Sequence, residues 1–356
     1  MTTILLITGS ILLVAILGLV YRIFNLVSIA KGSTRKRTTT SNKVNAIMFP
    51  LFLVIGFGLI FWYSNEARHY FLPEAASVHG KEIDTLFWVS MAVIFAAFFI
   101  THLLLLWFPF KYQYKETRTA HFYPHNDKLE IAWTIVPAVV MTVLVIYGLI
   151  TWNDITSPAP EGSLQVEIVG KQFNWMVRYP GQDQELGRHD YKKIDATNAL
   201  GMDFRDPNTL DDFVPREIHL PKGQSVKLNI RARDVLHSVF MPHFRLKMDA
   251  VPGMPTSFWF TPTISTREMR EKLSQEPAWQ EIDEDTGEPR WKNFNYELAC
   301  TEVCGGGHFA MRMVIVVDEP EEFQAWYGEQ ESWASKNMDY LSTLDIPELD
   351  LAAIKQ

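Results

Sequence analysis

Cysteine is scarce in this 356-residue chain, which has only Cys300 and Cys304. A single pair cannot build the framework of several disulfides that marks small secreted domains. The motif Cys-x-x-Cys-His is absent as well, which excludes the usual covalent attachment of a c-type haem. Any such haem would therefore belong to another chain.

Basic residues are in deficit, with 33 Lys and Arg against 41 Asp and Glu and a net charge of -8. Nucleic-acid binding needs Lys and Arg to neutralise phosphates, so we expect no nucleic-acid partner. An acidic surface would instead suit a basic partner or solubility. No Lys or Arg precedes the first apolar run, which begins at Ile4. That absence disfavours a cleaved signal peptide.

Long apolar runs are abundant in the first 150 residues. Crossing a bilayer takes about 20 apolar residues, and four stretches are long enough: 4–21, 46–63, 86–110 and 131–152. Trp62, Tyr63, Trp107 and Trp152 lie near span ends, as interfacial anchors do. The sequence predicts a membrane anchor of four helices, a pair in 1–64 and a hairpin in 65–155.

The charges between the spans predict the orientation. The loop between the second and third spans has only Arg68 and Lys81. The other two loops are richer, with Arg22, Lys31, Arg35, Lys36, Arg37 and Lys43 in the first and Lys111, Lys115, Arg118 and Lys128 in the last. The positive-inside rule places both richer loops in the cytoplasm. We therefore expect a bacterial inner-membrane protein with both termini on the periplasmic side.

Residues 156–320 are predicted to form an all-β barrel or sandwich outside the membrane. After a Pro-containing linker, apolar residues alternate with polar ones in 164–168 and 226–230, and 311–317 is a β-branched run. Two stretches, 181–216 and 265–293, break the pattern and are interpreted as inserted loops. The first holds an acidic cluster without EF-hand spacing, interpreted as solvated: Asp203, Asp206, Asn208, Asp211 and Asp212. Residues 321–356 are expected to form a helix and an acidic tail.

One short loop gathers soft metal ligands. It reads Cys300-Thr301-Glu302-Val303-Cys304-Gly305-Gly306-Gly307-His308-Phe309-Ala310-Met311. Thiolates, an imidazole and a thioether suit copper, and three glycines allow a tight fold that brings ligands together. His237 follows a predicted strand and offers one more ligand from a second loop.

The spacing alone leaves several interpretations open. The two cysteines could form a disulfide in an oxidising compartment. Zinc would accept two Cys and two His but would leave Met311 unused. A mononuclear blue copper site would leave one cysteine unexplained. A dinuclear copper site, bridged by both thiolates, would use every ligand.

The pattern C-x-E-x-C-x3-H-x2-M, together with the upstream Asp234-Val235-Leu236-His237-Ser238, closely resembles the CuA motif of subunit II of haem–copper cytochrome c oxidases. The resemblance covers roughly residues 84–330. It implies a membrane hairpin that carries a cupredoxin-type domain. It also implies electron transfer from a cytochrome c-type donor to haem in subunit I, where oxygen is reduced to water and protons are pumped. Subunit III is an expected further partner.

The resemblance also implies ligand roles. Cys300 and Cys304 would bridge two copper ions. His237 and Met311 would complete one copper, and His308 with the backbone carbonyl of Glu302 would complete the other. This chain would carry electrons and would have no catalytic residue of its own.

Further roles are implied outside the copper ligands. The Glu302 side chain would bind magnesium at the contact with subunit I, and Asp249 lies in 246–253, which resembles the family's segment near that interface. Glu130 stands in 130–137, which resembles the start of the family's second helix, and would mark the entrance of a proton channel. A carboxylate stabilised by the helix dipole is the simpler interpretation of Glu130.

The chain departs from the family in three respects, one of which is Val239 in place of the family's Trp after His-Ser. Phe173 stands where the family has the Trp through which electrons usually arrive, whereas Trp175 matches the family's later Trp. The family commonly has two spans, so 1–64 is extra, and we hypothesise that it binds a docked membrane complex that delivers electrons. The alternatives are a copper-free quinol oxidase subunit, a CuA-containing subunit of a nitric oxide reductase, and a non-catalytic copper-binding membrane protein.

Overall fold

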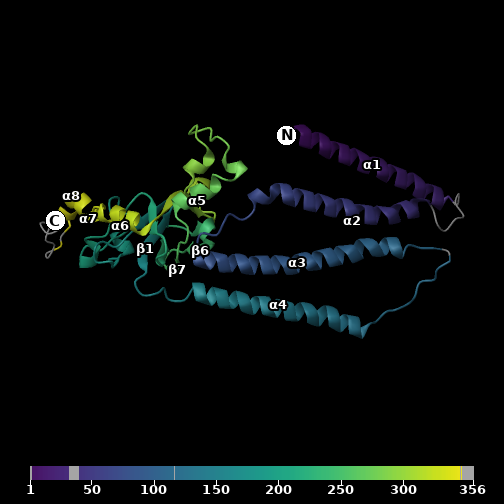
Figure 1. Ribbon diagram of the computed structural model, residues 1–356, viewed down its shortest axis with the longest axis horizontal. Coiled ribbons are helices and arrows are strands. Elements are labelled where there is room, and N and C mark those ends of the chain that lie inside the picture. The colour runs from purple at the N-terminus through teal and green to yellow at the C-terminus, as the bar shows by residue number, and fades with distance from the viewer. Residues whose placement is uncertain (1, 32–39, 116, 345, 347–356) are drawn as a thin grey trace. The chain divides into compact units, whose positions relative to one another are not determined.

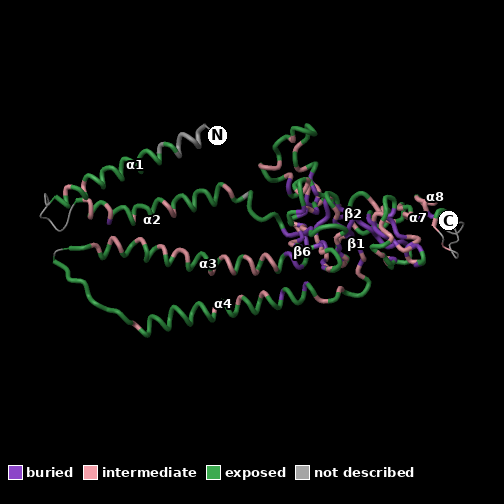
Figure 2. The backbone as a smooth tube through the Cα atoms, turned by 180° about the vertical axis from the view of Figure 1, so that it is seen from behind, coloured by how far each residue is buried: buried purple, intermediate pink, exposed green. Residues whose placement is uncertain are grey.

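Four long helices dominate the first part of the chain in the computed structural model, which describes residues 2–31, 40–115, 117–344 and 346. They are α1 (Thr2–Ala30), α2 (Thr40–Glu66), α3 (Val78–Lys111) and α4 (Asp127–Ile155). All four are long and apolar enough to cross a membrane. Most of their residues are exposed (Figure 2), as lipid-facing or subunit-facing helices are. The prediction of four spans is confirmed, while Arg35, Lys36 and Arg37 lie outside the described residues.

The extra helix α2 packs against the hairpin helix α3 through aromatic rings. The ring of Phe99 meets Phe57 edge-on, with centroids 4.8 Å apart, and stacks on Phe61 at 5.5 Å. Offset and edge-on geometries are the favoured ones for aromatic pairs. The second predicted span is therefore joined to the third by specific side-chain contacts.

Two sheets form the domain that follows α4 (Figure 1). A four-stranded sheet has the order β2-β1-β4-β7 and a five-stranded sheet the order β3-β9-β8-β5-β6. β1 pairs with β4 and β3 with β9 in parallel, and the other pairs are antiparallel. The strands are β1 (Leu164–Lys171), β2 (Asn174–Arg178), β3 (Ile218–Pro221), β4 (Val226–Ala232), β5 (His237–Met241), β6 (Leu246–Ala250), β7 (Thr256–Phe260), β8 (Tyr296–Cys300) and β9 (Arg312–Asp318).

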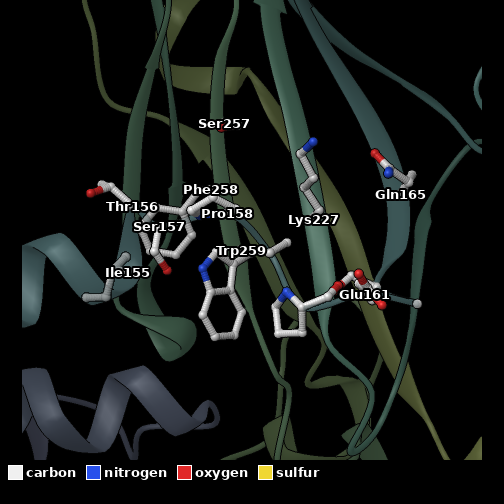
Figure 3. A pocket seen from close by; sticks show the side chains of 14 residues that line it. Ile155, Thr156, Ser157, Pro158, Glu161, Gln165, Lys227, Ser257, Phe258 and Trp259 are labelled. Carbon is white, nitrogen blue, oxygen red and sulfur yellow. The ribbon is translucent and has the colours of Figure 1, made fainter.

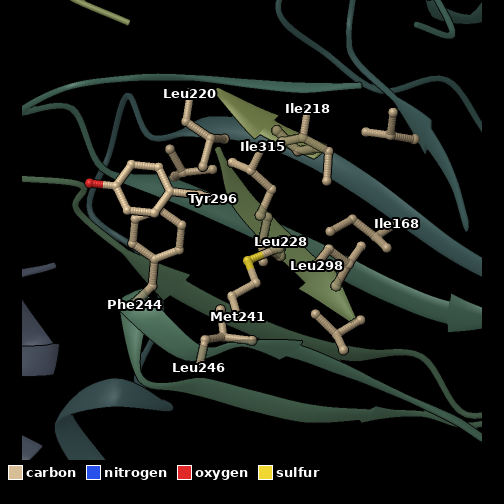
Figure 4. Packing of buried hydrophobic residues seen from close by; sticks show 14 of the residues in the cluster. Ile168, Ile218, Leu220, Leu228, Met241, Phe244, Leu246, Tyr296, Leu298 and Ile315 are labelled. Atoms are coloured by element: carbon tan, nitrogen blue, oxygen red, sulfur yellow. The ribbon is translucent and has the colours of Figure 1, made fainter. Parts of the chain in front are cut away.

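The core of this domain lies between the two sheets. Alternation along each strand sends every second side chain inward: in β4, Val226, Leu228 and Ile230 are buried while Lys227 and Asn229 are half-buried. Opposite them lie inward residues of the other sheet, among them Leu298 and Ile315 (Figure 4). The two packed sheets confirm the predicted all-β sandwich. The period-2 pattern in the sequence identifies strands that face this core.

The segment 181–216 is fastened to the four-stranded sheet by buried charges. Arg178 of β2 donates to Glu167 of β1 at 2.8 Å and to Asp212 at 2.9 Å, and its side chain is 1% exposed. Although burial opposes ionisation of Glu167, Arg178 and Arg231 lower its pKa to about 2. Asp212 is fully buried and Asp206 is buried as well, so the interpretation of the acidic cluster as solvated is wrong for these two residues. Burial raises the pKa of Asp212 to about 7, although Arg178 favours its charged form, so Arg178 is the cation that this buried carboxyl group depends on.

The segments outside the two sheets contain short helices. Residues 265–293 were expected to be a loop but contain α5 (Thr266–Leu273), capped by a reciprocal pair of hydrogen bonds between Ser265 and Glu268. After β9 the described residues form the short helices α6 (Pro320–Gly328), α7 (Trp333–Lys336) and α8 (Met338–Ser342). The last residues of the expected acidic tail, 345 and 347–356, lie outside the described residues.

The start of α3 is tied to the β domain. Arg245, which follows β5 in a left-handed conformation, donates two hydrogen bonds to Asp84 at 2.7 and 2.9 Å. The backbone of Ala76 donates to His243 at 2.7 Å and accepts from Thr263 at 2.8 Å. These contacts hold the domain on the membrane hairpin at a defined point.

Candidate metal centre

Strand pairing brings the two metal-ligand segments together. Val239 of β5 is the register partner of Cys300 in β8, and His237 is the first residue of β5. The backbone of Thr301 donates to Ser238 at 3.2 Å, and that of Cys300 donates to Met311 at 3.1 Å. The 300–311 loop is therefore closed at its base, and it lies beside His237.

Five side chains that were predicted as metal ligands lie close together, four from the 300–311 loop and His237 from β5. The ligand atoms of His237, Cys300 and Cys304 all lie within 4.8 Å of one another, and the three residues are buried. The two sulfurs are 4.0 Å apart, and both cysteines are free thiols, whereas a disulfide bond is about 2.05 Å long. His308 Nδ1 and Met311 Sδ lie 3.6 and 3.9 Å from the sulfur of Cys304.

The backbone carbonyl of Glu302 lies 3.2 Å from the sulfur of Cys300. It therefore joins the same cluster as the side chains. The Glu302 side chain itself is exposed, so the residue offers its carbonyl to the cluster and its carboxylate outward. The structure thus brings together all six predicted metal ligands.

Gly305 and Gly307 let Phe173 lie directly on the loop. Gly305 has φ +134°, and a Cβ there would come within 2.9 Å of the Phe173 ring. A Cβ on Gly307 would come within 2.5 Å of the same ring. At both positions an added Cβ would push the Phe173 ring away from the loop, so glycine permits this close contact. Phe173, which is 42% exposed, thus covers the metal-binding loop and still faces solvent.

A chain of hydrogen bonds holds His237 and the loop in place. His237 Nε2 donates to Asp234 at 2.8 Å, which leaves Nδ1 facing the sulfur of Cys300 at 3.9 Å. The other oxygen of Asp234 accepts from the backbone of Gln172 at 2.7 Å, and the Gln172 side chain donates to the carbonyl of Cys304 at 2.5 Å. A ligating histidine needs such a partner to fix its ring and tautomer.

Gln172 and Asp234 were not predicted as site residues. Asp234 stands three residues before His237 in the quoted motif, a local signal that could have indicated its role. Gln172 lies 62 residues from Asp234 in the sequence, so only the fold brings them together. The β1–β2 turn therefore contributes to the site both the covering ring of Phe173 and a supporting amide.

Trp175 is buried beneath the site. Its ring lies 5.9 Å from that of His237, and its indole N–H donates to the carbonyl of Met311 at 3.4 Å. Trp175 is 1% exposed, so it supports the inner side of the ligand cluster. Phe173 and Trp175 thus flank the site from outside and inside.

The remaining predicted residues lie away from the cluster. Asp249 is exposed on β6 and pairs in register with Ser238, next to the base of the Cys loop. Glu130 is exposed in the first turn of α4, and Thr134 donates to its backbone carbonyl at 2.9 Å. The structure brings neither of them to the thiols.

The donor set fits a soft cation. Burial and the neighbouring Cys300 raise the pKa of the Cys304 thiol to about 11, so two thiolates this close require a positive charge between them. Sulfur and imidazole ligands with a distant thioether are the combination that copper takes in electron-transfer sites. The residues present therefore fit a copper centre.

A two-sheet domain on a membrane anchor, with a His/Cys/Cys cluster at its strand ends, defines a membrane-anchored cupredoxin-like protein. Two family models match the chain: "Cytochrome C oxidase subunit II, transmembrane domain" over residues 65–150 and "Cytochrome C oxidase subunit II, periplasmic domain" over 164–266. The chain belongs to the cytochrome c oxidase subunit II family. It is thus a subunit of an oxidoreductase complex that includes other subunits, and its domain after α4 is extracytoplasmic.

Similar proteins come from several bacteria. The chain is 31% identical to the alternative cytochrome c oxidase subunit 2 of Bradyrhizobium diazoefficiens over 71% of this chain and 80% of that protein. It is 26% identical to cytochrome c oxidase subunit 2 of Thermostichus vulcanus over 77% and 82%, respectively. The crystal structure of the periplasmic domain of subunit II from Bradyrhizobium japonicum matches 48% of this chain and 94% of its own, with 22% identity and a TM-score of 0.30.

Proposed function

We propose that this chain is the electron-transfer subunit of a respiratory terminal oxidase and that the Cys loop holds a pair of copper ions. The observation that carries the proposal is the convergence of His237, Cys300 and Cys304 within 4.8 Å. Met311 adds weight, because zinc has no use for a thioether. Cys300, Cys304, His237, His308 and Met311 would hold the coppers, which would supply one-electron transfer.

The protein's own residues keep the ligand positions fixed. Asp234 holds His237 through Nε2, and Gln172 connects Asp234 to the backbone of Cys304. Trp175 holds the carbonyl of Met311. Because these supports come from two segments outside the Cys loop, the β1–β2 hairpin and Asp234 ahead of β5, the ligands need not move when the charge of the site changes. A rigid site has a low reorganisation cost for electron transfer.

We further propose that a cytochrome c-type donor approaches over Phe173 and that electrons continue to haem in subunit I. Phe173 supports this, because its half-exposed ring lies against Gly305 and Gly307. Oxygen reduction to water and proton pumping would take place in subunit I, with subunit III as a neighbour. The location we propose is the bacterial inner membrane, with both termini and the copper domain on the periplasmic side.

Three carboxylates outside the ligand cluster receive roles by the same proposal. Glu302 and Asp249 would hold magnesium at the contact with subunit I. Their position supports this. The backbone of Thr301, next to Glu302, donates a hydrogen bond to Ser238, and Ser238 is the register partner of Asp249. Glu130, exposed in the first turn of α4, would stand at the entrance of a proton channel.

Replacing one bridging ligand tests the function. Cys304→Ser in the full chain should bring cyanide-sensitive oxygen uptake by membranes down to background, because a hydroxyl cannot replace a bridging thiolate. Val303→Ser is the matched control, since Val303 is in the same loop but 81% exposed, and it should keep the wild-type rate. Normal oxygen uptake in Cys304→Ser would overturn the proposal. Nitric oxide consumption without oxygen uptake in the wild type would favour the reductase alternative.

A further inference from the structure

A pocket lies where the chain leaves the membrane anchor. Its volume is about 500 Å³, and it lies between the linker after α4 and the outer face of the four-stranded sheet (Figure 3). The first residue of its lining, Ile155, ends α4. Nothing in the proposed electron-transfer function uses this pocket.

The end of α4 indicates the depth of the pocket relative to a membrane. The apolar run of α4 ends at Trp152, which is 54% exposed, as interfacial anchors are. Ile155 is three residues further along the helix, a rise of about 4.5 Å. The headgroup layer on each side of a bilayer is roughly 5–8 Å thick. The end of α4 therefore indicates that the pocket is at the level of the headgroups of the outer leaflet.

A row of polar side chains crosses the sheet under the pocket. Gln165, Lys227 and Trp259 are consecutive register partners on β1, β4 and β7, so their side chains lie next to one another on the outer face. Lys227 has no ion pair among the residues that the structure describes. A cation without a partner in a concave site is available for a phosphate.

Trp259 adds a donor and an aromatic face. Its indole nitrogen is inaccessible to solvent and has no hydrogen-bond partner in the described part of the chain. Figure 3 shows this nitrogen on the side of Ser157 and Pro158 in the linker. A buried N–H without an acceptor is costly, so a ligand oxygen would stabilise it. Its ring could also receive an ammonium group.

Glu161 adds a negative charge to the rim of the same pocket. A purely anionic ligand would be repelled by this carboxylate, whereas a ligand with both charges can satisfy Lys227 and Glu161 at once. Ser257, exposed on β7, supplies a further hydroxyl. The pocket is thus complementary to a phosphate and an ammonium joined by a short chain.

We infer that this pocket binds the zwitterionic headgroup of a phosphatidylethanolamine lipid. Lys227 and the Trp259 N–H would hold the phosphate, and Glu161 and the Trp259 ring would receive the ammonium. The lipid would fix the linker on the sheet and thereby the domain on its anchor. This inference depends on the membrane anchor and not on the copper centre, so it can fail independently of the proposed function.

Site-specific crosslinking tests the inference. The purified oxidase complex with the full chain is placed in nanodiscs that contain phosphatidylethanolamine with a photoreactive diazirine near its headgroup, and crosslinked peptides are mapped by mass spectrometry. We expect labelling in 156–163 and 257–259. Lys227→Ala and Trp259→Phe should each reduce it about tenfold, the effect of losing one charge-assisted hydrogen bond. Lys227→Arg should keep it, and Lys336→Ala, an exposed lysine on α7, is the matched control.

Competition with unlabelled compounds shows which parts of the lipid the pocket recognises. Unlabelled phosphatidylethanolamine should displace the probe, whereas phosphatidylglycerol and soluble glycerophosphoethanolamine should do so at least tenfold less well, because one lacks the ammonium and the other the acyl chains. Equal displacement by either competitor would overturn the inference. It would also be overturned by unchanged labelling in Lys227→Ala and Trp259→Phe. Absence of labelling in the wild type, as expected if another subunit fills the pocket, would overturn it as well. Copper content of each variant serves as the check on folding.

Discussion

Single residues around the Cys loop divide into ligands and supports. The closeness of Cys300, Cys304, His308 and Met311 could be predicted because they stand in one short motif, whereas their roles as copper ligands were implied by the resemblance to the family. Gln172 and Asp234 could not be assigned, because the hydrogen bond between them depends on how β1 and β4 pair. Local chemistry is readable from a sequence, whereas contacts made across a sheet are not.

Replacing Asp234 tests whether it supports His237 as a ligand. Asp234→Asn should lower copper affinity about 10–100-fold, the usual effect of losing the partner of a ligating histidine. Competition with a copper chelator on the full chain would measure it. Asp339→Asn, an exposed aspartate on α8, should leave the affinity unchanged. Equal affinities in Asp234→Asn and the wild type would show that His237 does not need this support.

The strands followed from period-2 alternation, but α5 did not, because the charged composition of 265–293 outweighed a capping signal, Ser265 followed three residues later by Glu268. The burial of Asp212 was missed for a similar reason. The five polar residues of the acidic cluster in 203–212 have the composition of a solvated loop. Only the position of Arg178 on β2 shows that Asp212 forms a buried ion pair.

The attachment of the 181–216 segment can be measured through Arg178. Arg178→Met removes the cation shared by Glu167 and Asp212, and loss of one partner of a buried ion pair costs about 3–5 kcal/mol. Thermal unfolding of the full chain in detergent should show the loss. Arg188→Met is the matched control, because its side chain is 77% exposed and such a pair contributes about 0–1 kcal/mol. Equal destabilisation by the two variants would contradict the ion-pair account.

The attachment of α6 should depend on pH. His219 stacks on Trp326, with ring centroids 4.1 Å apart, and meets Asp318 at 2.6 Å. Burial opposes its charge, but hydrogen bonds with Asp318 and Glu217 raise the pKa of His219 overall. A raised folded pKa means that this stability is fully present below the ordinary value of about 6.5 and is lost as pH rises through the folded pKa.

Thermal melts across that window check this prediction. The melting temperature of the wild type should fall between about pH 6 and pH 9 by more than that of His219→Gln, which cannot titrate. His125→Gln, which changes an exposed histidine before α4, should retain the pH dependence of the wild type. Parallel curves for the wild type and His219→Gln would contradict the assignment.

The whole molecule combines a family core with an additional helix pair. The family matches cover 65–150 and 164–266, whereas α1 and α2 lie ahead of them. Helix α2 packs on α3 through Phe57, Phe61 and Phe99, which leaves α1 mostly exposed. Exposure on this scale suits lipid or another protein, and we hypothesise that the pair binds a membrane complex that delivers electrons.

Removing the pair tests that hypothesis. Deletion of residues 2–66 should release at least one associated complex on blue-native gels of detergent extracts, because its contact surface would be gone. Oxygen uptake driven by an added soluble reductant should continue, since the Cys loop is untouched. If every associated subunit remains in place, the helix pair has another role.

In the proposed function, the Cys loop and His237 hold two coppers that share an electron. Electron paramagnetic resonance of the full chain, together with its copper content, tests it most directly. The account predicts two coppers per chain and hyperfine splitting from both nuclei, with both features lost in Cys304→Ser. One copper with a single-nucleus pattern, or zinc in place of copper, would contradict it.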